Sequence, residues 1–194
     1  GAQIPPSMVR QHHWLGRWAQ NHATYKYFNG LVQEFAIWRR ILSATEVASL
    51  YDNGACDPNR LLLPTRAPTA TSSPTISSFG VYSDVSHALC FKDCVFSDSA
   101  GGMDATLVGG ATCTQGLGVQ LDGVNDYVDL DDVEIGDNTT ISFWARYDSM
   151  NSRSAVFTFT ERDWLDRIYV GNKENTQKVW LEMRVFDSLD RTRF

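Results

Sequence analysis

The stretch Gly118–Leu130, GVQLDGVNDYVDL, alternates apolar and polar side chains on either side of a polar turn. Val119 and Leu121 come before the turn, and Tyr127 and Val128 come after it. Alternation with a period of two is typical of β-strands, and Asp, Asn and Gly are typical of the turns that join them. The stretch therefore predicts two short strands joined by a tight connection.

Other segments of the chain show the same pattern. They are short, they are separated by turn residues, and they include TTISFWARY (139–147), SAVFTFT (154–160), RIYVG (167–171), KVWLEMRVF (178–186) and the segment Leu31–Ile37 that follows Asn29-Gly30. Many short strands at regular spacing, with one clear helix, predict an all-β fold of the antiparallel β-sandwich kind.

The one predicted helix lies in LSATEVASLYDNGAC, residues 42–56. Ser43 and Glu46 have the spacing of a capping box, in which each side chain binds a free amide of the first helical turn. Gly54 is expected to end the helix because glycine adopts a left-handed conformation at low cost. The expected apolar face consists of Val47, Leu50 and Tyr51.

Charge and composition exclude two classes of partner. The formal net charge is −6 and the sequence shows no cluster of Lys and Arg, so neither nucleic acid nor an anionic membrane is an expected partner. No apolar run approaches the length that crosses a bilayer, so membrane insertion is not expected. The chain starts without Met, and we expect it to begin inside a longer precursor.

A linker divides the chain. The stretch 57–78 holds four of the six prolines and is rich in Thr and Ser from Thr65 onward. Such a composition favours an extended, exposed stalk that carries O-linked sugar. The candidate acceptors are Thr65, Thr69, Thr71, Ser72, Ser73 and Thr75. A sequon for N-glycosylation stands at Asn138.

Three longer stretches resemble one protein family. GLGVQLDGVNDYVDL, NTTISFWARY and YFNGLVQEFAIWRRILSATEVASLY are similar to motifs of the laminin G-like modules, which belong to the concanavalin A-like lectin/glucanase superfamily. The resemblance implies an antiparallel jelly-roll β-sandwich. The closing motif precedes the opening motifs, so residues 1–56 are expected to end one module, residues 57–79 to form the linker, and residues 80–194 to form the first two thirds of a second module.

A circular permutation is the alternative. In that arrangement the segment Tyr27–Trp38 fills the gap in the sheet that the residues beyond Phe79 form, from its own chain or from a neighbouring one. An unfilled edge would otherwise be prone to associate with any strand of suitable pattern.

The four cysteines are expected to be oxidised, because no zinc-binding spacing accompanies them. Cys113 is expected to bond to Cys94 or Cys90 within the second module. Cys56 is expected to pair with the remaining cysteine if the linker folds back, or otherwise with a residue upstream of Gly1. An extracellular or cell-surface location suits these disulfides.

The resemblance implies an extracellular, non-catalytic protein for adhesion or for building an extended structure, with other extracellular proteins or further copies of itself as partners. Asp98 and Asp104, on the loop SDSAGGMDATL, are candidate ligands of calcium. Asp side chains and loop carbonyls supply the oxygen atoms that calcium binds. Gln33 stands where the family often carries Asp, which weakens a calcium site in the first module.

Two alternatives involve carbohydrate. A lectin-like module would bind glycans, and Trp14 and Trp18 are the candidates for stacking against a sugar ring. A glycan-active enzyme would need paired acidic residues on one strand, and the apolar strands show no such pattern. The acidic stretch DLDDVEIGD, residues 129–137, is interpreted as a solvated connecting loop. No catalytic residue is therefore assigned.

Overall fold

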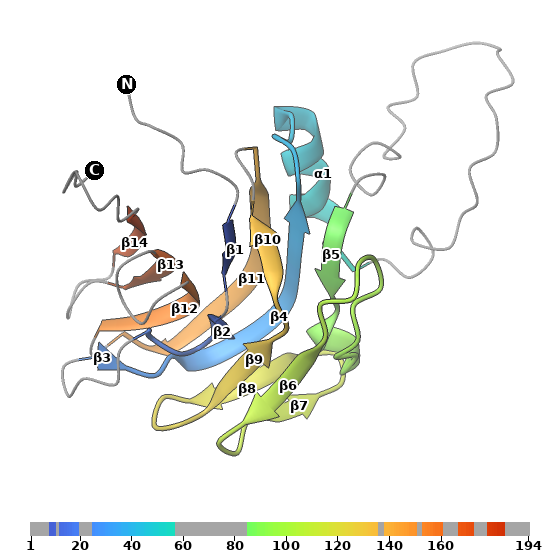
Figure 1. The fold of residues 1–194 in the computed structure, drawn as a ribbon. Helices are drawn as coiled ribbons and strands as arrows, with labels where there is room; N and C mark the ends of the chain where they lie inside the picture. Colours follow the sequence, from blue (N-terminus) through green and yellow to red (C-terminus); the bar gives the residue numbers. More distant parts are fainter. Residues whose placement is uncertain are drawn as a thin grey trace, which may run out of the picture.

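The computed structural model describes residues 8–10, 12–19, 25–56, 85–135, 138–150, 153–160, 167–172 and 178–184. They form two mostly antiparallel sheets that pack against each other, with one α-helix on the outside (Figure 1). The predicted all-β sandwich is confirmed. A separate small pair joins β1 (Met8–Arg10) and β10 (Val133–Ile135).

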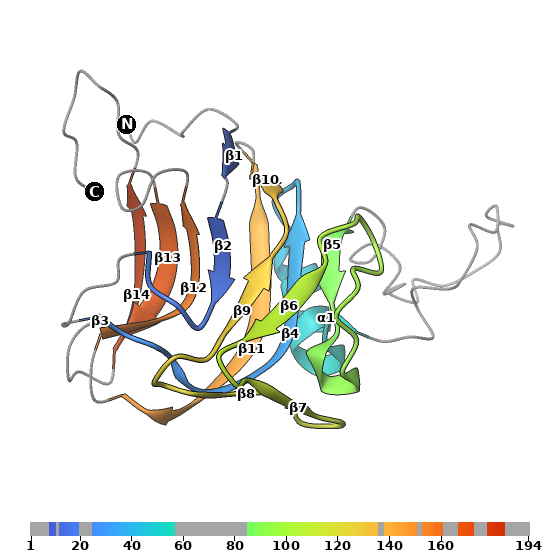
Figure 2. The same ribbon diagram turned by 60° about the horizontal axis from the view of Figure 1, so that its bottom comes forward.

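The first sheet has five strands in the order β11-β4-β8-β7, with β5 also paired to β4. Its members are β4 (Asn29–Trp38), β5 (Val85–Leu89), β7 (Thr112–Thr114), β8 (Gly118–Asp122) and β11 (Thr140–Ser149). One edge of β4 pairs with β11, and its other edge pairs with β8 at one end and β5 at the other. Strand β4 is therefore the centre of this sheet (Figure 2).

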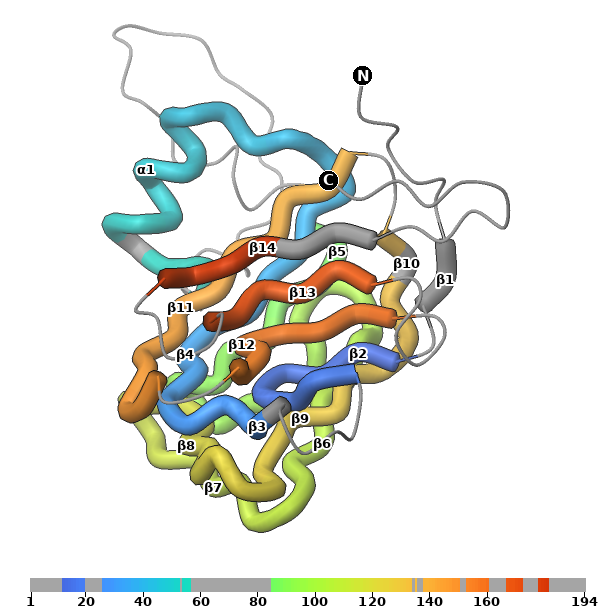
Figure 3. The backbone as a smooth tube through the Cα atoms, turned by 90° about the vertical axis from the view of Figure 1, so that its left-hand side faces the viewer, coloured from blue at the N-terminus to red at the C-terminus, as the bar shows by residue number. Residues whose placement is uncertain are grey.

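The second sheet has seven strands, in the order β14-β13-β12-β2-β9-β6, and β3 adds to β12 in parallel (Figure 3). Its members are β2 (His12–Leu15), β3 (Tyr25–Lys26), β6 (Ala105–Val108), β9 (Tyr127–Leu130), β12 (Arg153–Thr160), β13 (Arg167–Asn172) and β14 (Val179–Arg184). Strand β2 lies between β12 and β9, far from both in sequence.

The core lies between the two sheets. Successive residues of a strand point to opposite faces, so alternate apolar residues meet there. Phe35 of β4 contacts Phe157 and Phe159 of β12 through their ring edges, and Phe143 of β11 contacts Phe157 in the same way. Both sheets thus contribute to one continuous apolar cluster.

Segments before and after the linker share both sheets. Strand β4 fills the centre of a sheet whose other strands all come after residue 84. In the second sheet, β2 and the short β3 come from before the linker, and the other five strands come after it. The strand formed by Asn29–Trp38 therefore pairs with strands from beyond the linker in the same chain. The tandem array of modules and the circular permutation both stay predictions. The Asn29-Gly30 pair has the composition of a turn, but it begins β4.

Helix α1 (Ala44–Asn53) covers the outer face of the five-stranded sheet. The predicted capping box is present, with Ser43 bound to the Glu46 amide and Glu46 bound to the Ser43 amide. The predicted apolar face is only partly right, because Leu50 is buried against Trp38, whereas Val47 and Tyr51 are exposed. Tyr51 contacts the Trp144 ring of β11, with ring centres 5.5 Å apart, but the contact leaves most of its surface exposed.

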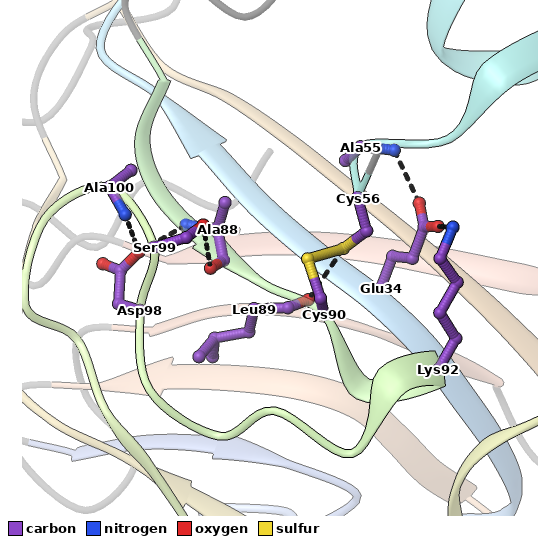
Figure 4. Close-up of a disulfide and its surroundings, with 10 residues drawn as sticks. All are labelled: Glu34, Ala55, Cys56, Ala88, Leu89, Cys90, Lys92, Asp98, Ser99 and Ala100. Atoms are coloured by element: carbon purple, nitrogen blue, oxygen red, sulfur yellow. Dashed lines mark hydrogen bonds and ion pairs between the residues drawn. A yellow bond between two sulfur atoms is a disulfide. The ribbon is translucent and has the colours of Figure 1, made fainter. Parts of the chain in front are cut away.

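The end of α1 is tied to the sheet by a buried carboxylate. The Glu34 side chain on β4 accepts a hydrogen bond from the Ala55 amide at 2.6 Å and pairs with the Lys92 ammonium at 3.0 Å (Figure 4). Gly54, which has φ +72°, lies against it, and a Cβ there would come within 2.6 Å of the carboxylate. A side chain at Gly54 would therefore displace Glu34.

Two disulfides cross-link the fold, Cys56–Cys90 and Cys94–Cys113. The second confirms the expected pairing of Cys113. The first joins the end of the α1 segment to the end of β5, on opposite sides of the linker (Figure 4). Cys56 thus pairs with the remaining cysteine, as expected for a chain that folds back.

Candidate functional site

A groove of about 600 Å³ lies on the outer face of the seven-stranded sheet. Trp14 of β2 points to this face, because its neighbours His13 and Leu15 are buried on the other side of the strand. Strand β9 runs beside β2 and brings Asp129 directly opposite Trp14. The groove is lined by His12, Trp14, Arg17, Gly102, Asp129, Leu130, Asp131 and Asp132.

Arg17 is held in place by aromatic rings. Its guanidinium carbon lies 4.4 Å from the centre of the Trp14 ring and 4.9 Å from the centre of the Tyr127 ring. The face of an aromatic ring attracts a cation, so the two rings restrict where the charge can lie. His12 stacks on Trp14, with ring centres 5.1 Å apart. The groove therefore contains a positioned donor group.

Three carboxylates supply acceptors in the same groove. Asp129, Asp131 and Asp132 are all exposed to solvent. Asp131 is oriented by the loop beside it, since its carboxylate accepts a hydrogen bond from the Asp104 amide and its own amide donates to the Asp104 carbonyl. Carboxylates only accept hydrogen bonds and guanidinium only donates them, so the groove offers both kinds of partner.

The two tryptophans proposed for sugar stacking have different surroundings. Trp14 lines the groove with a small exposed fraction of 8%. Trp18 is 5% exposed and packs against Tyr169, with ring centres 4.2 Å apart, and the Arg167 guanidinium lies 5.2 Å from its ring. Of the two, only Trp14 lies in the candidate site, since packing covers the Trp18 ring.

Asp98, proposed as a calcium ligand, organises its own loop. Its side chain is fully buried, and one oxygen accepts hydrogen bonds from the Ala88 and Ala100 amides, both at 2.8 Å. The other oxygen accepts from the Met103 amide and lies 2.8 Å from Nδ1 of His87. A carboxylate has about four acceptor sites. All are used here, which leaves no lone pair of Asp98 for a cation.

Asp104, the second calcium candidate, accepts a hydrogen bond from the Asp98 amide at 3.1 Å. Within the described ranges, no group of three or more His, Cys, Asp or Glu side chains is arranged to hold a metal ion. The geometry around Asp98 and Asp104 therefore supports a structural role for both residues.

Replacing Asp98 with Asn is expected to destabilise the protein by roughly 2 kcal/mol at pH 7, because two donors would face the new amide group. Burial alone would raise the pKa of Asp98, but hydrogen bonds from His87 and three backbone amides outweigh it and lower the pKa to about 2. The folded-state pKa is lower than the unfolded one, so the stabilisation exists above about pH 4 and is lost toward pH 2.

Urea unfolding across this pH range would measure the effect. The free energy difference between the native protein and Asp98→Asn should shrink as the pH falls from 4 to 2. The exposed Asp93→Asn variant is the control and should stay within about 0.5 kcal/mol of the native protein. A constant difference across the range would show that the ionised carboxylate contributes nothing.

The glycosylation candidates fall in two regions. Asn138 is exposed in a bend just before β11, a position that an attached sugar could occupy without disturbing the core. The candidates Thr65, Thr69, Thr71, Ser72, Ser73 and Thr75 lie outside the described residues. Glycosylation at both regions stays a prediction.

Most residues of the groove were not identified from the sequence. The stretch DLDDVEIGD was interpreted as one loop, but Asp129 belongs to β9 and β10 begins at Val133. Only the pairing of β2 with β9 shows that Arg17 and the acidic residues lie together. The alternation in HHWL, which puts His12 and Trp14 on one face, was the one available signal.

Comparison with known proteins found no family model, curated protein or solved structure that matches this chain. Among the described residues, no helix is both long and apolar enough to span a bilayer. The two disulfides suggest an oxidising environment of the extracellular type. Fold and site together define a disulfide-containing β-sandwich with a polar, aromatic groove on one sheet.

Proposed function

We propose that this chain is a non-catalytic binding module that acts outside the cell or at its surface and binds a saccharide in the groove. The observation that carries the proposal is the position of the Arg17 guanidinium over Trp14 and Tyr127, next to three exposed carboxylates. The function that follows is adhesion to glycan-bearing surfaces or assembly of an extended extracellular structure.

The mixture of charges favours a neutral ligand rich in hydroxyl groups. Asp129, Asp131 and Asp132 would repel an anion, and a cation offers no acceptor to the Arg17 guanidinium. A sugar hydroxyl both donates and accepts, so it can bind a carboxylate and the guanidinium at the same time. The edge of Trp14 adds an apolar contact for the ring carbons. The groove volume of about 600 Å³ suits a small oligosaccharide.

Two further observations support the proposed setting. The disulfides Cys56–Cys90 and Cys94–Cys113 suit an oxidising compartment. The sequence resemblance to laminin G-like modules, carried by the motifs quoted above, agrees with a role in extracellular adhesion. Both observations are compatible with any neutral glycan, so the proposed ligand is a neutral glycan as a class.

Replacing Arg17 or Asp129 with Ala is expected to weaken glycan binding at least tenfold, because each change removes hydrogen bonds made by a charged group. The experiment is a glycan array with the intact protein, followed by calorimetry with the strongest neutral glycan. Arg146→Ala is the matched control, since the Arg146 side chain is 63% exposed on β11 in the other sheet. The affinity of the Arg146→Ala variant for the glycan should equal that of the native protein.

Two results would overturn the proposal. Binding of no glycan on the array, or binding that Arg17→Ala and Asp129→Ala leave unchanged, would remove the groove as a saccharide site. Release of reducing sugar from a polysaccharide, lost in Asp129→Ala, would replace the binding module with a glycan-active enzyme.

A further inference from the structure

A row of stacked side chains starts in the groove and continues beyond it. His12 stacks on Trp14, and the Arg17 guanidinium lies over the rings of both Trp14 and Tyr127. Tyr127 lies beside Tyr27, with ring centres 6.3 Å apart and ring planes 33° apart. We call these five side chains the aromatic row. The first three line the groove, and the two tyrosines extend the row past it.

Strand β9 sets the direction of Tyr127. Tyr127 and Asp129 are two residues apart on β9, so they point to the same face of the sheet. Val128 between them is buried in the core, and Asp129 lies opposite Trp14 in the groove. Two residues of a strand span about 6.6 Å. Tyr127 therefore continues the outer face of the sheet on the side of Asp129 that is away from Asp131.

The turn after β2 brings Tyr27 to the end of the row. The Gly16 carbonyl accepts a hydrogen bond from the Phe28 amide at 2.8 Å. Gly16 has φ +85°, and a Cβ there would collide with the Leu121 side chain, so the turn needs glycine. Phe28 is fully buried in the core, whereas its neighbour Tyr27 is half-buried and meets Tyr127. The backbone thus holds the outer tyrosine in place.

We propose that Tyr127 and Tyr27 form a further subsite of the groove, and that the protein binds a linear neutral oligosaccharide along the aromatic row. This inference rests on the proposed saccharide-binding function. One part of the oligosaccharide forms hydrogen bonds with Arg17 and Asp129. The following sugar units lie against the two tyrosine rings. The site therefore recognises a stretch of several sugar units rather than a single terminal sugar.

The chemistry changes along the row in a way that suits a sugar chain. Around Arg17 the groove offers charged donors and acceptors for hydroxyl groups. Beyond Arg17 the row offers two tyrosine rings, each with an apolar face and one hydroxyl group. A sugar ring likewise has apolar carbon atoms on its face and hydroxyl groups at its rim. Both tyrosines are half-buried, so part of each side chain stays accessible to a ligand.

Chain length is the variable that tests the subsite. The probes are cello-, manno- and xylo-oligosaccharides, from disaccharide to hexasaccharide, titrated into the full chain by calorimetry. In the series that binds, we expect the affinity to rise roughly fivefold or more from disaccharide to hexasaccharide, because only the longer chain reaches the tyrosines. On the native protein, the hexasaccharide should shift the nuclear magnetic resonance signals of the Tyr27 ring, and the disaccharide should not.

Tyr27→Ala is expected to remove the gain from chain length and to leave the disaccharide affinity within about twofold of the native value. Tyr27→Phe keeps the ring and should keep the gain. Tyr51→Ala is the matched control, because Tyr51 is 72% exposed on α1, which covers the other sheet. It should bind every oligosaccharide as the native protein does. Thermal melting would establish that each variant is folded.

The failure of this inference can be told apart from the failure of the groove. Equal affinity for disaccharide and hexasaccharide, or a gain that persists in Tyr27→Ala, would remove the subsite and leave the saccharide groove in place. Loss of affinity for all lengths in Tyr27→Ala would make Tyr27 a support for Arg17 instead of a subsite. Binding of no oligosaccharide and of no glycan on the array would overturn the groove and the subsite together.

Discussion

The segment from Phe79 to Phe194, expressed without residues 1–56, is expected to be insoluble or aggregated. Strand β4 supplies the central strand of the five-stranded sheet, and its loss would leave β11, β8 and β5 without their shared neighbour. It would also uncover the core around Phe35 and Ile37, both fully buried. Each such side chain contributes about 1.5–3 kcal/mol by burial, and a whole domain is stable by only about 5–15 kcal/mol.

Co-expression of residues 1–56 is expected to restore a soluble complex, because β4 and β2 then pair with their partners in trans. The control is co-expression with residues 1–56 that carry Val32→Asp and Phe35→Asp. This variant segment should not restore solubility, because both native side chains are fully buried. Size-exclusion chromatography and thermal melting would measure the result. A soluble, cooperatively melting monomer of the segment Phe79–Phe194 alone would refute the need for β4.

Replacing Cys56 and Cys90 together with Ser is expected to cost about 3.5–4 kcal/mol of stability and to lower Tm by roughly 10 °C. The two residues are 34 positions apart, and the bond closes the loop that contains the linker. Without it, the unfolded chain gains conformational freedom. The loss of the bond also frees the end of α1, where the Ala55 amide binds Glu34.

A protease site inserted between residues 65 and 75 tests whether this disulfide, rather than Cys94–Cys113, joins the two sides of the linker. After cleavage, the oxidised protein should remain one covalent species in denaturing gels and should separate into two fragments on reduction. The Cys94→Ser/Cys113→Ser variant is the control, because that bond lies on one side of the linker and its loss should leave the two fragments joined. Separation of the oxidised, cleaved protein would contradict the pairing of Cys56 with Cys90.

Local features of the chain were predicted well because they depend on neighbours in sequence. The capping box needs only Ser43 and Glu46, three residues apart, and the strands around Val119 and Phe143 follow from alternation. The disulfide of Cys113 was narrowed to two partners, and the structure selects Cys94. The burial of α1 was predicted less well, since the sequence does not show how much of the sheet lies beneath Val47 and Tyr51.

The candidate site could not be predicted as a whole. Trp14 was named from its residue type alone, and Trp18 was named on the same basis although packing against Tyr169 covers it. Arg17 and Asp129 are more than a hundred residues apart and meet only because β2 inserts between β12 and β9. Asp98 was interpreted as a ligand because the sequence does not show the four donors that surround it.

By itself, the sequence determined the all-β class, the single capped helix and the oxidised state of the cysteines, since these depend on periodicity, short-range capping and cysteine number. Only the tertiary structure decided that β4 joins strands from beyond the linker and that Arg17 lies among carboxylates. Alternating apolar residues give a strand one buried face but do not specify its neighbour, and that choice is made by packing over the whole core.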